Sequence, residues 1–304
     1  MAEGTRAGVP VGRFAPSPTG PLHFGSLVAA VGSYCLARCA GGRWLVRIED
    51  LDTPRVVAGA AEDVLRTLER FGLTWDGPVW WQSRRREHYE AALDSLARQG
   101  RLFACGCSRK EVLASAPHVG EEGPVYPGTC RQGLPAGRPA RAWRLRVTDR
   151  MVEFDDPVWG RQRQNLAVEV GDFVLRRADG LFAYQLAVVV DDAASGITQV
   201  VRGQDLLAST PRQLFLQQCL SYPAPQYLHL PLALGPDGAK VSKRHGALAV
   251  QESQEPGALL WRALRFLGQP VPEELYGAPA PELLAWALSC FRAERIPARS
   301  APAG

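Results

Sequence analysis

Residues 12–26 of the chain, GRFAPSPTGPLHFGS, join the end of a short strand to the start of a helix through a stiff loop. Residues 9–14 have the pattern of a strand. The prolines that follow fix the backbone and remove amide donors, so the loop is neither helix nor central strand. Residues 26–40 are small and apolar and end at Gly41-Gly42, which predicts a buried helix with a glycine stop.

The same alternation continues along the first third of the chain. Strands are expected at residues 43–48 and 102–105, and amphipathic helices at residues 57–71 and 84–99. Strands that alternate with helices in this way indicate an α/β fold with a parallel sheet.

The rest of the chain departs from this rhythm. Residues 108–140 are rich in glycine and proline and read as a small insertion, whereas residues 141–205 are strand-like. The nearly apolar run at residues 182–190 predicts a buried strand. Further expectations are turns at 161–162 and 178–180, a helix at 206–220, a strand and loop within 227–250, two short helical stretches from 256, and a frayed end from Ile296.

The composition is that of an ordinary globular protein. The chain has 304 residues, of which 46% are hydrophobic and 22% charged, and this excludes collagen-like, disordered and mini-protein classes. The net charge of +4 permits nucleic-acid binding without indicating it. Neither a run of 18 apolar residues nor an apolar N-terminal signal segment occurs, so we expect a cytoplasmic protein without a membrane helix.

His23 and Gly25 lie where the first predicted helix begins. A helix N-terminus offers free N–H groups and a positive dipole to a phosphate, and a glycine lets a nucleotide approach the backbone. His23 can then hydrogen-bond phosphate oxygens. The alternative is a proline-rich loop whose histidine only caps the helix.

Lysine is scarce in this chain. It occurs only at Lys110, Lys240 and Lys243, so the 35 lysines and arginines include 35 − 3 = 32 arginines. Two of the three lysines lie in the run KVSKR that ends at Arg244. A lysine is a compact point charge suited to phosphate oxygens, and such charges would offset the charge that develops during attack at phosphorus. The alternative is a solvated basic loop.

Together the two motifs resemble the HIGH and KMSKS signatures of class I aminoacyl-tRNA synthetases. The opening RFAPSPTG at residues 13–20 resembles the glutamyl-tRNA synthetase family, as do RIEDLDTPR at 47–55, VVDD at 189–192 and ITQVVRGQDLLASTPRQ at 197–213. Two positions depart from the signatures, because Ser26 replaces a histidine and Arg244 replaces a serine. Both departures leave His23, Gly25 and Lys243 in place.

Length separates two branches of this family. Only residues 245–304 follow the lysine-rich run, which is too short for a large helical anticodon-binding domain. The chain therefore resembles the stand-alone paralogues, the glutamyl-Q tRNA(Asp) synthetases. That resemblance implies a Rossmann-type catalytic domain with an inserted zinc-binding subdomain and no anticodon-binding domain.

The resemblance also implies a two-step reaction. L-Glutamate is activated by ATP with Mg²⁺, without tRNA, and is then transferred to the queuosine base at the anticodon wobble position of tRNA(Asp). The alternatives are a truncated glutamyl-tRNA synthetase that charges a tRNA 3′ end, a nucleotidyltransferase of the same superfamily, and a non-catalytic tRNA-binding module. A monomer that does not bind membranes is expected.

The family positions carry roles onto particular residues. Catalytic roles fall on His23, Lys243 and Lys240, supported by Arg244, and ATP binding falls on His23, Gly25 and Lys243. Glutamate binding falls on Arg13, Ala15, Ser17, Glu49, Tyr184 and Arg202, with the two arginines on the carboxylates and Glu49 on the ammonium group. The alternatives are an ion pair of Glu49 with Arg47 or Arg55, and a surface position on a strand for Arg202.

Cys105, Cys107 and Cys130 form a separate group. Thiolates are preferred zinc ligands and a structural zinc site wants four ligands, so a Cys-x-Cys pair at the edge of a small insertion indicates zinc. His118 and Tyr126 are both available as the fourth ligand, and general zinc chemistry favours His118. The resemblance implies Tyr126 instead, because the family pattern Tyr-x-x-x-Cys matches residues 126–130. The alternative is three buried or free thiols.

These interpretations divide the chain into four segments. Residues 1–104 are expected to be the first half of the catalytic domain, and residues 105–140 the zinc-binding insertion. Residues 141–255 are expected to hold the second half, with an acceptor-like insertion and the KMSKS-type loop. Residues 256–304 are expected to be a short helical tail.

Overall fold

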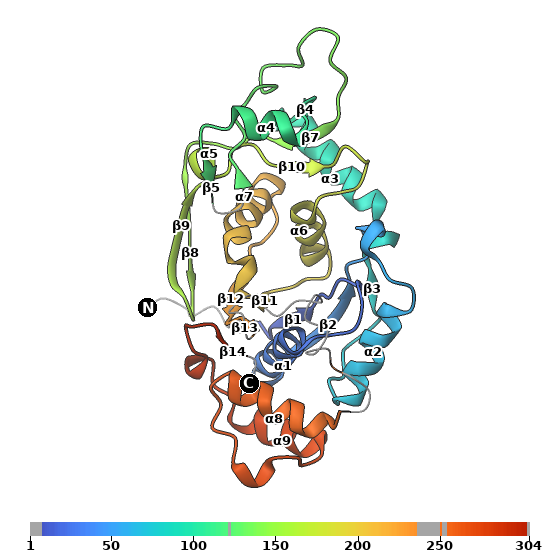
Figure 1. Ribbon diagram of the computed structural model, residues 1–304, viewed down its shortest axis with the longest axis vertical. Helices are drawn as coiled ribbons and strands as arrows, with labels where there is room; N and C mark the ends of the chain where they lie inside the picture. Colours follow the sequence, from blue (N-terminus) through green and yellow to red (C-terminus); the bar gives the residue numbers. More distant parts are fainter. Residues whose placement is uncertain (1–7, 121–122, 236–249, 251–253, 303–304) are drawn as a thin grey trace.

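The computed structural model describes residues 8–120, 123–235, 250 and 254–302. Parallel strands form its centre (Figure 1). One group, in the order β1-β2-β3, contains β1 (Val11–Phe14), β2 (Arg43–Ile48) and β3 (Trp80–Trp81). In the other group β11 (Gln199–Gly203) pairs with β12 (Gln226–Leu230). β1 and β11 pack side by side, so the parallel α/β architecture expected from the sequence is present.

The helix α1 (Phe24–Cys39) is covered on both sides. It packs on β1 and β11, and against α8 (Pro256–Phe266) and α9 (Ala280–Cys290), which lie beyond it in Figure 1. The close packing explains its small residues, because a Cβ on Gly32 would come within 2.7 Å of Leu230 Cδ1. The helix α2 (Ala60–Arg70) adds its apolar face to the same core.

A second core lies above the parallel strands. It is built from α3 (Arg86–Arg98), α6 (Tyr184–Ala194) and α7 (Thr210–Leu220). Beside these helices, β4 (Leu102–Cys105) pairs with β7 (Ala142–Leu145), which pairs with β10 (Val174–Arg176). Figure 1 shows this layer above β1, β2 and β3.

The sequence alternation predicted that residues 102–105 would continue the parallel sheet, and this prediction is wrong. The strand β4 pairs antiparallel with β7, and β7 pairs antiparallel with β10. Antiparallel neighbours need only a direct return of the chain, whereas parallel neighbours need a crossover. Residues 106–141 make that return, and they hold α4 (Arg109–Ser115), β5 (Val119–Gly120) and β6 (Gly123–Pro124).

The prediction of a buried strand at residues 182–190 is wrong, because this segment enters α6. Every residue from Gln185 to Asp192 is buried. A run that is buried on all sides has no polar face, so its periodicity does not separate helix from strand. The helix places Tyr184 in its first turn and Asp191 and Asp192 near its end.

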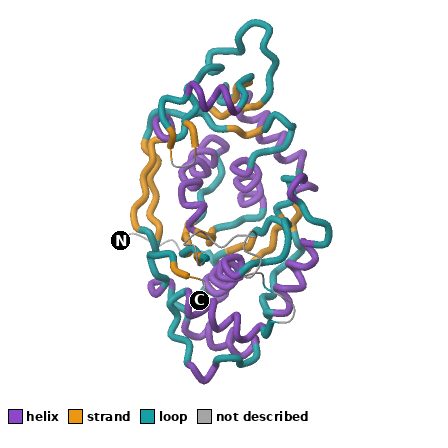
Figure 2. Tube along the Cα trace, viewed as in Figure 1, coloured by secondary structure: helices purple, strands orange, loops and turns teal. Residues whose placement is uncertain are grey.

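A long hairpin flanks the second core. Its strands β8 (Met151–Asp156) and β9 (Gly160–Asn165) run along one side of the molecule in Figure 2. The turn lies at residues 157–159, so the predicted turn at 161–162 is wrong. Asp156 fixes the earlier turn, because its Oδ1 accepts hydrogen bonds from the amides of Val158 (2.9 Å) and Trp159 (3.0 Å).

The last residues also differ from expectation. The two helical stretches are confirmed as α8 and α9, but the described residues from Ile296 to Pro302 are not frayed. Ile296 is buried in the main core, and β14 (Ala301–Pro302) pairs in parallel with β13 (Ala233–Leu234). Among the described residues, no helix has the length and apolar character needed to cross a membrane.

The remaining elements are short. They are α5 (Leu166–Glu169) and the 3₁₀ turns at Thr53–Arg55, Gln82–Arg84, Gln204–Ser209, Glu273–Leu275 and Ala293–Arg295.

Candidate active site

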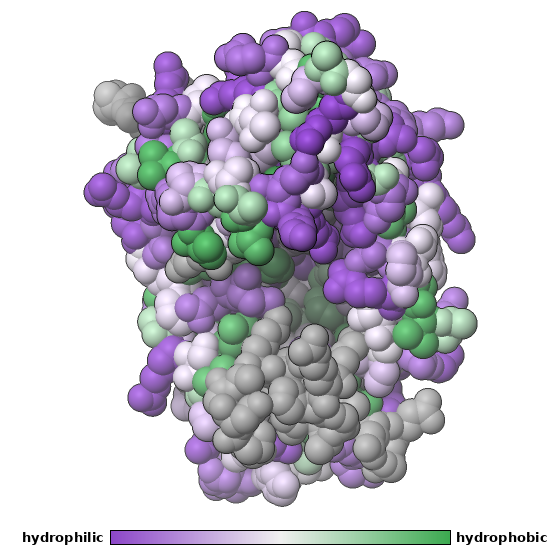
Figure 3. Space-filling model, turned by 45° about the horizontal axis from the view of Figure 1, so that its top comes forward, coloured by the Kyte–Doolittle hydropathy of each residue, from purple (hydrophilic) through white to green (hydrophobic). Residues whose placement is uncertain are grey.

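A cavity of about 520 Å³ opens where β1, β2 and β11 end. Ligands in sheets of this kind bind beyond the carboxyl ends of the strands. The molecular surface is hollowed near the centre of the face in Figure 3, where apolar side chains are recessed below hydrophilic ones. The cavity wall includes all the predicted substrate residues that the structure describes: Arg13, Ala15, Ser17, His23, Gly25, Glu49, Tyr184 and Arg202.

His23 caps the N-terminus of α1. Its Nδ1 accepts a hydrogen bond from the Ser26 amide (3.2 Å), and its Nε2 lies 3.1 Å from Ser26 Oγ. His23 is therefore a helix cap that also lines the cavity, which is compatible with both the capping and the phosphate-binding interpretation. Ser26, where the sequence departs from the HIGH signature, contacts the imidazole. The helix N-terminus adds its positive dipole to this wall.

Arg13 is held by a buried carboxylate on α6. Its Nε lies 3.2 Å from Asp192 Oδ1, and its Nη2 lies 3.4 Å from Asp192 Oδ2. Asp192 also accepts from Arg47 Nη1 at 2.6 Å. Burial alone would raise the pKa of Asp192, but the two neighbouring arginines hold it below its usual range. The carboxylate is therefore ionised and fixes both guanidinium groups.

Glu49 follows β2 and joins the same group of charges. Arg47 Nη2 donates to Glu49 Oε1 at 3.2 Å, so the ion pair with Arg47 exists, whereas Arg55 pairs with Asp52. Glu49 also lines the cavity. Burial raises the pKa of Glu49, although Arg47 and Arg13 act in the opposite direction.

Asp191 anchors this group from behind. It accepts from Arg85 Nε (2.5 Å), Gln82 Nε2 (2.9 Å) and the Tyr89 hydroxyl (2.7 Å). In the sequence, Asp191 and Asp192 belong to a motif that resembles the family, but the motif alone assigns them no role. Their function of holding arginines becomes visible only once α6 lies against β1 and β2. We call Arg13, Arg47, Arg85, Glu49, Asp191 and Asp192 the ionic cluster.

Arg202, on the neighbouring strand β11, is surrounded by neutral groups. It is 5% exposed, so the interpretation as a surface charge is wrong. Among the described residues no ion pair involves it; its N–H groups meet uncharged acceptors instead. These acceptors are His229 Nε2 (3.1 Å), Gln213 Oε1 (2.7 Å), Tyr184 OH (3.4 Å), Leu206 O (3.2 Å) and Thr210 Oγ1 (2.7 Å). We call these five residues the neutral shell.

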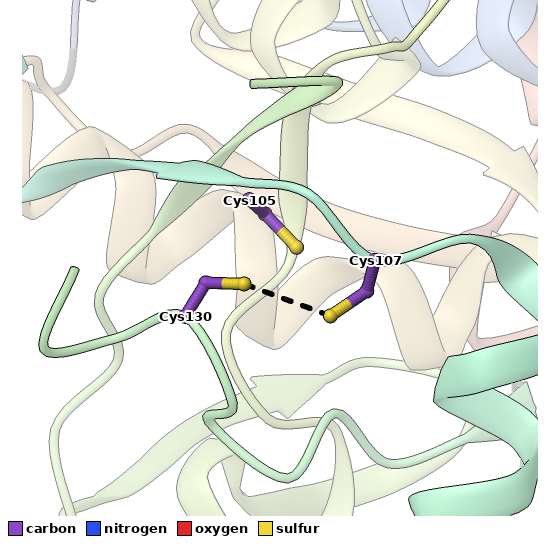
Figure 4. A group of neighbouring side chains, drawn as sticks. All are labelled: Cys105, Cys107 and Cys130. Atoms are coloured by element: carbon purple, nitrogen blue, oxygen red, sulfur yellow. Dashed lines mark hydrogen bonds between the residues drawn. The ribbon is translucent and has the colours of Figure 1, made fainter. Parts of the chain in front are cut away.

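Three cysteines converge at the start of the insertion (Figure 4). The sulfur atoms of Cys105, Cys107 and Cys130 all lie within 4.8 Å of one another, and this group could hold a metal ion. The Tyr126 hydroxyl lies 3.4 Å from Cys105 Sγ and accepts from the Cys130 amide at 2.9 Å. His118 is exposed and, within the part of the chain that the structure describes, does not join the group.

The predicted lysine loop cannot be placed against this site. Lys240, Lys243 and Arg244 lie outside the described residues.

Comparison with known proteins agrees with this geometry. The family model for the catalytic domain of class I tRNA synthetases (E and Q) matches residues 10–274. A glutamyl-Q tRNA(Asp) synthetase of Dechloromonas aromatica is 60% identical over 290 residues, which cover 95% of this chain and 96% of that protein. The chain belongs to the glutamyl-Q tRNA(Asp) synthetase family.

Other similar proteins include a further glutamyl-Q tRNA(Asp) synthetase and a glutamate tRNA ligase. A glutamyl-Q tRNA(Asp) synthetase of Geobacter sulfurreducens is 56% identical over 298 residues, covering 96% of this chain and 95% of that protein. A solved glutamate tRNA ligase of Elizabethkingia meningosepticum, in complex with its amino acid, superposes with a TM-score of 0.81 at 25% identity. That match covers 97% of this chain and 67% of the ligase.

Proposed function

We propose that this protein activates L-glutamate with ATP, without tRNA, and transfers the glutamyl group to the queuosine base of tRNA(Asp). Membership in the glutamyl-Q tRNA(Asp) synthetases supports the substrate pair. The observation that carries the proposal is a cavity that joins a helix N-terminus, two buried arginines and a partly buried glutamate. This combination suits a nucleotide phosphate together with an amino acid that has two carboxylates and one ammonium group.

Each charged group of glutamate has a complementary partner in the cavity wall. Arg202 has a positive charge without a carboxylate partner among the described residues, so a substrate carboxylate supplies the missing negative charge. Arg13 binds the other carboxylate. Glu49 binds the ammonium group, with the Tyr184 hydroxyl beside it, and Ala15 and Ser17 close the same loop around the substrate.

The first step is an in-line displacement. A glutamate carboxylate oxygen attacks the α-phosphorus of ATP, the bond to the bridging oxygen breaks, and pyrophosphate leaves. His23 and the N-terminus of α1 stabilise the charge on the phosphate oxygens, with Lys243 and Lys240 as further cations. A general base is unnecessary because the attacking carboxylate is already ionised. Catalysis then depends on positioning and electrostatic stabilisation.

The second step transfers the activated acyl group. A hydroxyl of the queuosine cyclopentene ring attacks the glutamyl carbonyl carbon, and AMP leaves with the former carboxylate oxygen. The attacking hydroxyl loses its proton in this step.

The test of this function uses two assays. We expect glutamate-dependent ATP–pyrophosphate exchange without tRNA, followed by transfer of labelled glutamate to tRNA(Asp) that contains queuosine. The matched control is tRNA(Asp) from cells that lack queuosine, which should accept no glutamate. Equal labelling of both tRNAs would point to charging of a 3′ end and would reject the proposal.

We further propose that the cysteine group holds one structural zinc ion. A tetrahedral ion with Zn–S bonds of about 2.3 Å places its sulfurs roughly 3.8 Å apart, and the sulfurs of Cys107 and Cys130 are 3.6 Å apart. Tyr126 would supply the fourth ligand through its hydroxyl oxygen. The ion would tie β4 to the insertion.

Zinc analysis tests this second proposal. We expect one zinc per chain in the purified protein and none in the double variant Cys105→Ser, Cys107→Ser. The double variant Cys35→Ser, Cys219→Ser is the control, because these buried thiols lie outside the group and should leave the metal content unchanged. A purified protein free of zinc, with its thiols reduced, would contradict the proposal.

A further inference from the structure

His229, on β12, is fully buried and has no part in the proposed chemistry. Its two ring nitrogens join Arg202 to an aspartate of the β8–β9 hairpin. The Nδ1 atom lies 2.7 Å from Asp156 Oδ2, and the Nε2 atom lies 3.1 Å from Arg202 Nε. An arginine N–H can only donate, so Nε2 is the acceptor and the proton sits on Nδ1. Burial lowers the pKa of His229 despite the nearby Asp156, which keeps the ring neutral.

Asp156 is itself held in one orientation. Besides the ring of His229, its Oδ2 accepts from the His229 amide at 2.9 Å, and its Oδ1 accepts from the two turn amides. Trp159 Nε1 donates to the His229 carbonyl at 2.9 Å. The hairpin turn therefore contacts His229 through both Asp156 and Trp159. Burial would raise the pKa of Asp156, but His229 and the turn amides lower it overall. The carboxylate is thus an ionised acceptor that fixes the tautomer of the ring.

This arrangement supports Arg202 from behind. Arg202, Tyr184 and Leu206 line the cavity, but His229, Gln213 and Thr210 do not. The contact between Arg202 Nη1 and the Tyr184 hydroxyl is the longest of the five, at 3.4 Å, and it lies on the cavity side. The rear contacts therefore set the plane of the guanidinium group, while its cavity edge remains the part that a ligand can engage.

We propose that His229 and Asp156 are positioning residues that orient Arg202 and thereby determine the affinity for glutamate. The inference rests on the proposed role of Arg202 in binding a substrate carboxylate. A guanidinium group binds a carboxylate through two parallel hydrogen bonds, so a rotation of its plane weakens both. Asp156 acts through His229, and neither residue touches the substrate.

Two substitutions of His229 separate positioning from a merely structural role. His229→Asn retains a donor at the position of Nδ1 and loses the acceptor for Arg202. His229→Gln can place its amide oxygen near the position of Nε2 and loses the donor to Asp156. Positioning predicts that the Asn variant has the higher KM for glutamate. If His229 only links the strand to the hairpin, the Gln variant should lose more stability than the Asn variant. The folded fraction of either variant should then have the parental KM for glutamate.

The assay is tRNA-free ATP–pyrophosphate exchange, with KM for glutamate and KM for ATP measured separately. In His229→Asn we expect the glutamate KM to rise about 10- to 100-fold, as for loss of a hydrogen bond to a charged group. The ATP KM should stay within about twofold, and His229→Gln should recover at least part of the loss. Equal changes in both KM values, or a glutamate KM like that of the parent, would overturn the proposal.

Two further variants complete the test. If His229→Asn does not fold, Asp156→Asn replaces it, because the neutral amide no longer fixes the ring proton; a parental glutamate KM in that variant would also overturn the proposal. Arg202→Lys tests the underlying function. If it leaves the glutamate KM unchanged, the role of Arg202 itself fails. If Arg202→Lys raises the KM while the His229 and Asp156 variants do not, only the positioning role fails.

Discussion

Two neighbouring strands of the cavity wall, β1 and β11, each hold a buried arginine, and they do so in opposite ways. Arg13 belongs to the ionic cluster, where Asp192 compensates its charge. Arg202 is surrounded by the neutral shell, whose uncharged atoms accept its hydrogen bonds, and no carboxylate among the described residues pairs with it. A buried charge with hydrogen bonds and no counter-ion is costly until an anion arrives. The neutral shell thus fits the proposed role of Arg202 in binding a carboxylate, whereas the ionic cluster holds its arginines in fixed positions.

The difference also explains why Glu49 and Arg13 can share one wall. Arg47 contacts both Glu49 and Asp192, so it holds the two carboxylates at fixed positions. Without Arg47, Glu49 would be free to pair with the nearby Arg13. Asp192 does not line the cavity, so its loss should affect stability first. Changes to Glu49, which lines the cavity, and to the neutral shell should affect glutamate affinity first.

The largest effect is expected for Asp192→Asn. Removal of this charge leaves Arg13 and Arg47 without their shared partner, and breaking a buried pair costs about 3–5 kcal/mol. Chemical denaturation measures the free energy of unfolding. Asp94→Asn on the exposed face of α3 is the control and should change it little. Unfolding free energies for Asp192→Asn and Asp94→Asn that agree within error would remove the basis of the comparison.

An intermediate effect is expected for Glu49→Gln. The amide keeps the shape of the side chain but loses the charge offered to the ammonium group, so the glutamate KM should rise about 10- to 100-fold. Stability should change less than in Asp192→Asn, because burial already disfavours the charged form of Glu49. Pyrophosphate exchange gives the KM and denaturation gives the stability. A larger loss of stability than in Asp192→Asn would show that Glu49 is mainly structural.

A smaller effect is expected for Thr210→Val. The substitution keeps the branched shape and removes one of the five acceptors around Arg202, while Leu206 O still accepts from the same nitrogen. Because Leu206 O remains as an acceptor, we expect a cost of about 1 kcal/mol, below the usual cost of losing a hydrogen bond to a charged group. This cost corresponds to roughly a fivefold rise in the glutamate KM. The ATP KM serves as the internal control. A loss as great as that of Arg202→Lys would mean that the shell acts as one cooperative unit.

The smallest effect is expected for the dependence of the unfolding free energy on pH in the acidic range. The folded protein holds the pKa of Asp192 below its ordinary value of 3.8. The stabilisation is therefore fully present above that ordinary value and is lost as the pH falls through the lowered pKa of the folded state. The difference in unfolding free energy between the parent and Asp192→Asn should narrow over that interval. A difference that stays constant down to the lowest pH at which both fold would contradict an ionised Asp192.

Much of the site was readable from the sequence because its residues sit at chain positions with local signatures. The strand, proline loop and helix start around His23 are determined within residues 12–26. The tripeptide of Cys105 and Cys107 likewise indicates a metal site without any knowledge of the fold. The helix α6 could not be predicted, because a segment that is buried on every side shows no helical periodicity of polar and apolar residues. The turn at 157–159 was missed because it depends on one aspartate side chain that accepts two amides.

The sequence by itself determined the family, the α/β class and most of the predicted site residues that line the cavity. Only the tertiary structure decided which of two similar buried arginines has a charged partner. Asp192 lies 179 residues from Arg13, and Asp156 lies 73 residues from His229. No local pattern links such positions, since electrostatic interactions depend on distance in space and on exclusion of water. Those two quantities exist only once α6, β12 and the β8–β9 hairpin have packed around the cavity.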